Sequence, residues 1–151
     1  MVSLSTENDF VLDLPYPPSI NRIWRSNPRA TTQKKVYIAP AYQAWQDEAN
    51  GALMQKRGWI MRRIKGPFSI DLALCPPKGH PRGDLDNRIK AVLDFLQNAT
   101  IIDNDKHCQL ICAYWAPGPE QCRVTVKPWS PQAAATVNDV LRAALQRMEA
   151  V

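Results

Sequence analysis

The chain has 151 residues, which suits one domain with its own hydrophobic core, and we expect a single domain over residues 1–151. With 45% hydrophobic and 22% charged residues, and without repeats or low-complexity tracts, the composition is that of an ordinary soluble globular protein. No apolar run approaches the ~18–20 residues of a membrane span, and the N-terminus lacks the regions of a signal peptide, so we expect a cytoplasmic protein.

The positive charge is concentrated in one part of the chain. The net charge is +5 with a pI near 9.2, but residues 15–90 hold 14 lysines and arginines against five aspartates and glutamates. Nucleic acid is the partner that such a basic region most often indicates, because neutralising its phosphates releases counterions. Composition alone leaves a generically basic surface as an equal alternative.

The four cysteines form no recognisable metal-binding pattern. The sequence contains no Cys-x-x-Cys pair, and its two histidines leave few ligands for zinc. Three of the cysteines fall among apolar residues in strand-like segments: Cys108, Cys112 and Cys122. We therefore expect the cysteines to be buried, reduced thiols.

The N-terminal part predicts a short strand and a long irregular segment. Alternating apolar residues predict a strand over residues 10–14, and prolines then open a segment without regular structure that runs to about residue 39. In this segment basic residues, which suit phosphates, alternate with aromatic rings, which suit bases and sugars. They are Arg22, Arg25, Arg29, Lys34 and Lys35, with Tyr16, Trp24 and Tyr37. Alternatively, Tyr16 and Trp24 could fold back onto the core.

The middle of the chain predicts two helices with a strand between them. Pro40 begins a helix that extends to about Lys56, with apolar residues at helical spacing. Strict alternation predicts a half-buried strand over residues 68–75. A second helix follows from Asp84, whose side chain can cap it by accepting a backbone N–H. The apolar stripe of that helix consists of Leu85, Ile89, Val92, Leu93 and Leu96.

The C-terminal part predicts two strands and a last helix. Residues 107–115 and 120–127 are predicted to be strands of a hairpin-like pair, joined by a Pro-Gly-Pro turn. Ser130 can cap an extra C-terminal helix over residues 130–149. The order of the elements predicts an α/β or α+β fold, in which helices pack on a mixed sheet.

Acidic residues gather around the second helix. Asp84 precedes it, Asp86 lies in its first turn, and Asp103 and Asp105 precede the next strand. Carboxylates at one place repel each other unless a cation holds them, and Mg2+ is bound by a few carboxylates with water and phosphates. Such an ion can polarise a phosphate and lower the pKa of a water molecule. Lys90, on the same rim of the helix as Asp86, could neutralise charge that develops on the phosphate.

A purely structural interpretation of these residues is also open. Asp84 could be a helix cap and Asp86 a partner of the helix dipole, without any metal. Asp103 could be a further ligand or a simple turn residue. Asp94 could pair with a basic neighbour on the helix surface.

Two stretches of the chain resemble the RusA-type family of Holliday junction resolvases. Residues 17–24, Pro-Pro-Ser-Ile-Asn-Arg-Ile-Trp, resemble the family's N-terminal PPSxNxxW stretch. Residues 84–94, Asp-Leu-Asp-Asn-Arg-Ile-Lys-Ala-Val-Leu-Asp, resemble its DLDNxxKAxxD signature. The resemblance covers about residues 10–128, and Asp105 stands where the family places its third metal carboxylate.

The resemblance implies an endodeoxyribonuclease that depends on Mg2+, for which Mn2+ can substitute, and that acts in DNA recombination and repair. It would bind four-way junctions as a homodimer and nick two strands symmetrically, since two matched nicks need two matched active sites. The family's metal ligands correspond to Asp84, Asp86 and Asp105, and its catalytic lysine to Lys90. Its members often come from phages and prophages.

The resemblance also implies DNA contacts, with two departures from the family pattern. Asn21 corresponds to part of the family's DNA-binding or active-site surface. The further DNA contacts that we expect are Arg22, Arg25, Arg29, Lys34, Lys35 and Arg82. The family commonly has a basic residue directly before the first aspartate, where this chain has Gly83. The C-terminal helix extends past the region of resemblance.

Two other functions are compatible with the same sequence. A non-catalytic protein of this fold could bind branched DNA with a vestigial acidic cluster, although the retained lysine and carboxylates argue against it. A nuclease of this fold could also act on flaps or forks, because shape selectivity depends on dimer geometry and DNA deformation rather than on a motif.

Overall fold

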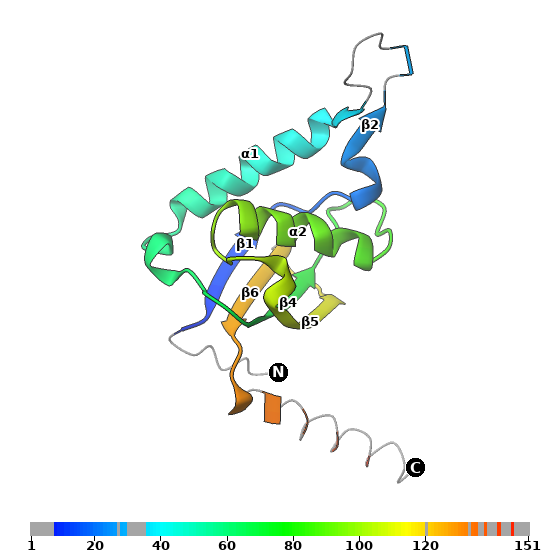
Figure 1. The fold of residues 1–151 in the computed structure, drawn as a ribbon. Coiled ribbons are helices and arrows are strands. Elements are labelled where there is room, and N and C mark those ends of the chain that lie inside the picture. Colours follow the sequence, from blue (N-terminus) through cyan, green and yellow to red (C-terminus); the bar gives the residue numbers. More distant parts are fainter. Residues whose placement is uncertain are drawn as a thin grey trace.

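Strands and helices are mixed along the chain (Figure 1). The computed structural model describes residues 8–26, 28–29, 36–119, 121–132, 134–135, 138, 142 and 146. The strands are β1 (Phe10–Leu14), β2 (Trp24–Ser26), β3 (Val36–Ile38), β4 (Phe68–Leu74), β5 (Cys108–Trp115) and β6 (Cys122–Pro128). The helices are α1 (Pro40–Gln55) and α2 (Asp86–Asn98), with short 3-10 turns η1 (Ile20–Arg22), η2 (Trp59–Arg62) and η3 (Asp105–His107).

Four of the strands form one mixed sheet in the order β1-β6-β4-β5. β4 pairs parallel with β5, whereas β4 with β6 and β6 with β1 are antiparallel pairs. The predicted mixed sheet with helices packed on it is confirmed. The predicted hairpin of residues 107–127 is wrong, because β4 lies between β5 and β6. β4 and β6 are the two interior strands, and the large apolar residues of β4 are fully buried, since a strand paired on both edges is well shielded: Phe68, Ile70, Leu72 and Leu74.

Both long helices pack on one face of this sheet and on each other. The apolar stripes predicted for them are mostly the buried residues: Tyr42, Trp45, Ala49 and Leu53 in α1, and Val92, Leu93 and Leu96 in α2. The rings of Trp45 and Phe95 meet edge to face, with centroids 5.8 Å apart. The opposite face of the sheet carries two ion pairs, Asp13 with Arg123 at 2.7 Å and Asp71 with Lys127 at 2.9 Å.

The N-terminal irregular segment contains more regular structure than expected. Residues of β2 and β3 pair as a small antiparallel ribbon, separate from the main sheet. The sequence hid it because each strand has three residues, too few for an alternation to stand out. The C-terminal helix stays a prediction: the N–H of Ala134 bonds the carbonyl of Ser130 at 3.0 Å, but most later residues lie outside the described part.

The cysteines are free thiols that differ in burial. Cys122 is buried, and burial raises its pKa to about 12, so this thiol stays protonated. Cys75 and Cys108 are half-buried, and Cys112 is exposed, so the prediction of buried thiols is wrong for Cys112, which lies on the edge strand β5. Within the described residues, no helix is long and apolar enough to cross a membrane.

Candidate active site

The signature residues lie where a glycine-containing loop enters α2. The helix begins at Asp86 with Leu85 at its N-cap, so Asp84 lies just outside it and does not provide the expected cap. Instead, Oδ2 of Asp84 accepts a hydrogen bond of 3.1 Å from the side-chain amide of Asn87. The carboxylates of both Asp84 and Asp86 are exposed and belong to the same entry into the helix, as the sequence predicts.

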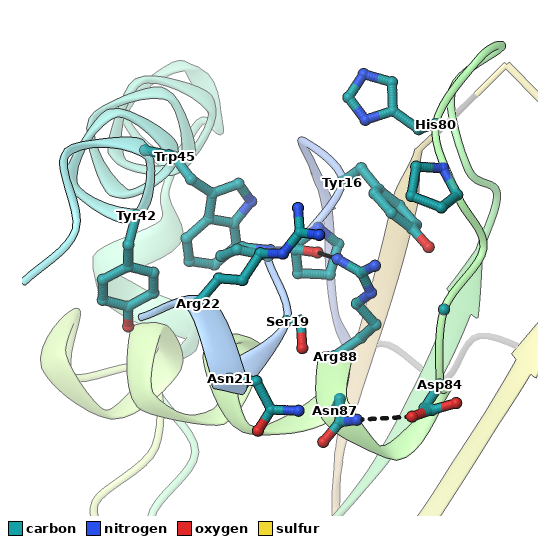
Figure 2. A pocket seen from close by; sticks show the side chains of 15 residues that line it. Tyr16, Ser19, Asn21, Arg22, Tyr42, Trp45, His80, Asp84, Asn87 and Arg88 are labelled. Atoms are coloured by element: carbon teal, nitrogen blue, oxygen red, sulfur yellow. Dashed lines mark hydrogen bonds between the residues drawn. The ribbon is translucent and has the colours of Figure 1, made fainter. Parts of the chain in front are cut away.

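A cleft of about 550 Å³ joins this helix start to the proline-rich loop, and Figure 2 shows the side chains that line it. The walls come from residues 16–22, the first turns of α1, and residues 80–88. Asn21 and Arg22, exposed on η1, line this cleft together with Asp84. Two parts of the family resemblance, more than 60 residues apart in sequence, therefore meet in one place.

Arg88 ties the two walls of the cleft together. Its Nη1 donates to the carbonyl of Pro17 at 2.8 Å, and its guanidinium lies 4.7 Å from the ring centre of Tyr16. Within the described part of the chain, its buried Nε has no hydrogen-bond partner. A guanidinium in this position fixes the proline-rich loop against the first turns of α2.

The position of Arg88 also explains the glycine before the first aspartate. Gly83 has a φ of +64°, a left-handed conformation that disfavours other residues. A Cβ at this position would lie 2.9 Å from Nη2 of Arg88, so the end of the arginine side chain would have to move. The departure from the family's usual basic residue at position 83 is therefore matched by an arginine that occupies the neighbouring space from α2.

Two further bonds hold the proline-rich loop in place. Nε1 of Trp45 donates to the carbonyl of Pro15 at 3.0 Å, and the hydroxyl of Tyr16 donates to the carbonyl of Arg82 at 2.9 Å. Burial raises the pKa of Tyr16 above its ordinary value, so the hydroxyl remains a donor. The guanidinium of Arg82 lies 4.5 Å from the ring centre of Trp115, which anchors the loop from the other side.

A second, more open cleft contains both signature carboxylates. Its volume is about 830 Å³, and it lies between the start of α2 and the inward side of β5. Asp84, Asp86 and Ile89 line it on one side, and Ile111 and Ala113 on the other. Asp84 lines both clefts, so it stands where the carboxylates of one meet the basic residues of the other.

Lys90 stands between two carboxylates. Its Nζ lies 2.7 Å from Oδ1 of Asp94 and 2.8 Å from Oδ2 of Asp105. The hydrogen bonds to Asp105 and then to Asp94 raise the pKa of Lys90, and the bond from Lys90 lowers the pKa of Asp105. Lys90 is therefore a permanent cation near neutral pH. The pairing proposed for Asp94 with a basic neighbour is confirmed.

The two candidates for the third carboxylate have different surroundings. The backbone N–H of Asp105 donates to Oε1 of Gln97 at 2.9 Å, which fixes η3 against α2. Asp103 instead accepts a hydrogen bond of 3.1 Å from the backbone N–H of Gly66, on the far side of the turn. Asp105, and not Asp103, therefore pairs with Lys90, and its role as a metal ligand stays a prediction.

Of the three expected metal ligands, Asp84 and Asp86 are placed so that they could hold Mg2+ together, and Asp105 is not. Among the described residues, no group of three or more His, Cys, Asp and Glu side chains is close enough to hold a metal. Asp84 and Asp86 share one cleft, whereas Asp105 is bonded to Lys90. Mg2+ is often held by one or two carboxylates, its other positions being water and substrate phosphate, so two aspartates are a sufficient protein set.

The expected DNA contacts are distributed between the cleft and the ribbon. Arg25 and Arg29 are exposed, Arg25 on β2 and Arg29 after it. Trp24 is also exposed and does not fold back on the core, whereas Tyr16 packs partly against it. Lys34 and Lys35 lie outside the described residues.

Sequence reasoning missed the contacts that hold the proline-rich loop in place. Tyr16, Trp45 and Arg88 brace the proline-rich loop, yet they read as loop, core and surface residues. One signal was available for Arg88: it follows Asp84 by four residues, so it must lie over the same helix entry.

Comparison with known proteins agrees with this site. The family model described as Endodeoxyribonuclease RusA matches residues 15–127. The chain belongs to the RusA endodeoxyribonuclease family. It is similar to a protein of Enterobacteria phage HK97 named crossover junction endodeoxyribonuclease rusA, with 29% identity over 99 residues, or 66% of this chain and 76% of that protein. The chain is therefore a nuclease, and the region that matches the RusA family contains every residue of both clefts.

Proposed function

We propose that this RusA-family nuclease resolves four-way (Holliday) DNA junctions by paired, symmetric strand nicks, as a homodimer that uses Mg2+, in recombination and repair. The observation that carries the proposal is Asp84, which lines both the cleft of carboxylates and the cleft of basic residues. A phosphodiester held by the basic residues would reach the carboxylates. The printed name of the phage relative, a crossover junction endodeoxyribonuclease, supports the choice of substrate.

Asp84 and Asp86 would hold the metal, with Asp105 as a third ligand if it leaves Lys90. When bound, Mg2+ would supply a polarised phosphate and a more acidic water molecule. Carboxylate ligands suit this hard cation, and the open cleft leaves room for water and a phosphate oxygen beside them. Mn2+ accepts the same oxygen donors.

Lys90 would act as a cation rather than a base. Its pKa is raised by the bonds to Asp105 and Asp94, so it carries its charge throughout the neutral range. An ammonium group placed one turn after Asp86 can neutralise charge that builds up on the phosphate oxygens in the transition state. Asp94 orients the ammonium group, and Asp105 does so as long as it does not bind the metal, since both pair with it at 2.7 and 2.8 Å.

Arg22, Arg88 and Asn21 would position the DNA strand. All three line the first cleft, and Arg88 is fixed by its bond to Pro17 and its contact with Tyr16. Guanidinium groups match phosphate oxygens in geometry as well as charge. In a metal-assisted cleavage of a phosphodiester, the protein contributes mainly by holding the phosphate in position. Rigid hydrogen-bond donors serve this purpose.

A homodimer would give one active site to each of the two strands that are cut. The edge strand β5 offers a surface for the second copy, because Tyr114 is 48% exposed on it, on the face opposite to the cleft of carboxylates. An unpaired strand edge with exposed apolar side chains is a common site of association. Sedimentation of the purified protein tests the dimer, and a monomer at all concentrations that support cleavage would contradict it.

Cleavage of a synthetic four-way junction tests the function, with Mg2+, with EDTA, and with linear duplex, flap and fork controls. The Asp86→Asn variant should cut at least ~100-fold more slowly than wild type, since a metal ligand loses its charge, yet bind the junction normally. Asp47→Asn is the matched control, because Asp47 is exposed on α1, away from both clefts. Normal cleavage by Asp86→Asn would contradict the metal site, and equal cutting of the linear duplex would contradict the junction as substrate.

A further inference from the structure

Apart from Arg25, an expected DNA contact, the residues of the β2–β3 ribbon have no role in the two clefts described so far. Each residue of its two strands is exposed, and Figure 1 shows β2 standing off beyond the N-terminal end of α1, away from the main sheet. A two-stranded ribbon is marginally stable in water by itself, and its exposed apolar side chains do not help it to fold. We propose that this ribbon stacks on the unstacked bases at the branch point of DNA, an inference that rests on the function proposed above.

The pairing register gives the ribbon one aromatic ring on each face. Trp24 lies opposite Ile38, and Arg25 lies opposite Tyr37. Opposed residues share a face and neighbours alternate, so one face presents Trp24 with Ile38 and the other presents Tyr37 with Arg25. Trp24 is 59% exposed and Tyr37 47% exposed, so both rings are accessible for stacking.

The ribbon is fixed at its base next to the active site. Ile23 and Ala39, which flank it, are buried, and the N–H of Ala39 donates to the carbonyl of Ile23 at 2.8 Å. Ile23 directly follows η1, whose Asn21 and Arg22 line the cleft with Asp84. A DNA strand held by Asn21 and Arg22 in the cleft would therefore lie next to the base of the ribbon.

Charge and chemistry together select nucleic acid as the occupant. The six residues of the two strands include an arginine and no acidic residue, and the segment before them carries Arg22. Aromatic rings stack on every base, and a guanidinium group beside a ring adds charge for the phosphates. An intact duplex keeps its bases stacked, whereas a branch point exposes base faces. The ribbon would thus favour branched DNA over linear DNA.

Binding without cleavage tests this inference. A labelled four-way junction with 2-aminopurine at the branch point is titrated with protein in EDTA, beside a linear duplex of the same length. Trp24→Ala and Tyr37→Ala should each weaken junction binding about tenfold and leave duplex binding unchanged, since one stacking contact is lost. Trp24→Phe should keep most of the affinity because it keeps a ring. Met54→Ala, which removes an exposed apolar side chain from α1, is the control.

The outcomes separate this inference from the proposed function. If wild type cuts the junction but Trp24→Ala binds it as tightly, with unchanged 2-aminopurine fluorescence, the ribbon does not stack on bases. If Trp24→Ala turns a dimer into a monomer in sedimentation, the ribbon is a subunit contact and the inference is wrong. If wild type neither binds nor cuts the junction, the proposed function fails first and the inference fails with it. Unchanged thermal unfolding of each variant excludes misfolding as the cause.

Discussion

The start of α2 and the β2–β3 ribbon are both rich in functional side chains, but they are built in opposite ways. At the start of α2, hydrogen bonds and ring contacts from Tyr16, Arg88 and Trp45 fix the walls of the cleft. In the ribbon, only the base is buried and every strand residue is exposed. Phosphodiester cleavage needs side chains held in one geometry, whereas recognition of deformable DNA needs exposed groups.

Because the side chains at the start of α2 are held in one geometry, the rate of DNA cleavage should be sensitive to single substitutions in this helix. Lys90→Gln removes a positive charge and nearly keeps the side-chain size. Cleavage of the junction should fall about 100-fold or more, because one electrostatic contact to the developing charge is lost, while junction affinity in EDTA stays close to wild type. The measurement is single-turnover cleavage with saturating protein.

Lys106→Gln is the matched control for this substitution, because Lys106 is exposed and lies directly after Asp105. It should leave the cleavage rate unchanged. Equal loss in both variants would mean that overall charge near η3, rather than Lys90 itself, matters. An unchanged rate in Lys90→Gln would remove Lys90 from the active site.

Two glycines allow the bracing of the cleft to be measured. Gly83→Ala and Gly79→Ala both place a Cβ on a left-handed residue, with φ of +64° and +83°. The strain alone should cost about 1 kcal/mol of unfolding free energy at each site. At Gly83 the new Cβ also lies 2.9 Å from Arg88, whereas nothing lies within 4 Å at Gly79. Urea unfolding should therefore show a total loss of about 2 kcal/mol for Gly83→Ala, because the guanidinium leaves Pro17 and Tyr16.

Function should separate the two glycine variants more clearly than stability. Gly83→Ala should slow cleavage because Arg88 is displaced, and Gly79→Ala should not. In the double variant Gly83→Ala/Arg88→Ala the close contact is absent. Its loss of unfolding free energy should therefore not exceed the loss in Arg88→Ala plus the strain of about 1 kcal/mol at residue 83. Equal losses of stability and of activity in both single variants would mean that Arg88 does not brace the cleft.

The sequence predicts the long elements of the fold but not the order of the strands in the sheet. The mixed fold, both long helices and their buried stripes follow from periodicity, because long elements average over many residues. The pairing of β4 with both β5 and β6 did not follow, since strand order depends on which strand is buried most deeply rather than on proximity along the chain.

The candidate site was predictable in part for a related reason. Asp84 and Asp86 stand two residues apart at one helix entry, so local geometry places both in one cleft, whereas the role predicted for Lys90 beside them stays a prediction. Arg88 and Tyr16 meet only because the proline-rich loop crosses over α2, a contact between residues far apart in sequence. The ribbon was hidden for another reason, since its strands are short and their residues are not sorted by burial.

The smallest expected effect comes from the same substitution in both regions. Tyr16→Phe removes the hydroxyl that donates to the carbonyl of Arg82, so unfolding free energy should fall by about 1 kcal/mol. Tyr37→Phe changes an exposed side chain of the ribbon and should alter stability by less than about 0.5 kcal/mol. Because burial raises the pKa of Tyr16, the folded protein keeps a proton that the unfolded chain loses near pH 10. Stability of wild type should therefore decrease as the pH rises through 10, and this decrease should be smaller in Tyr16→Phe but unchanged in Tyr37→Phe. Urea unfolding at pH 7 and at about pH 11 measures both quantities, since the loss lies above the unfolded pKa. Identical behaviour of the two variants would mean that the cleft is no better braced than the ribbon.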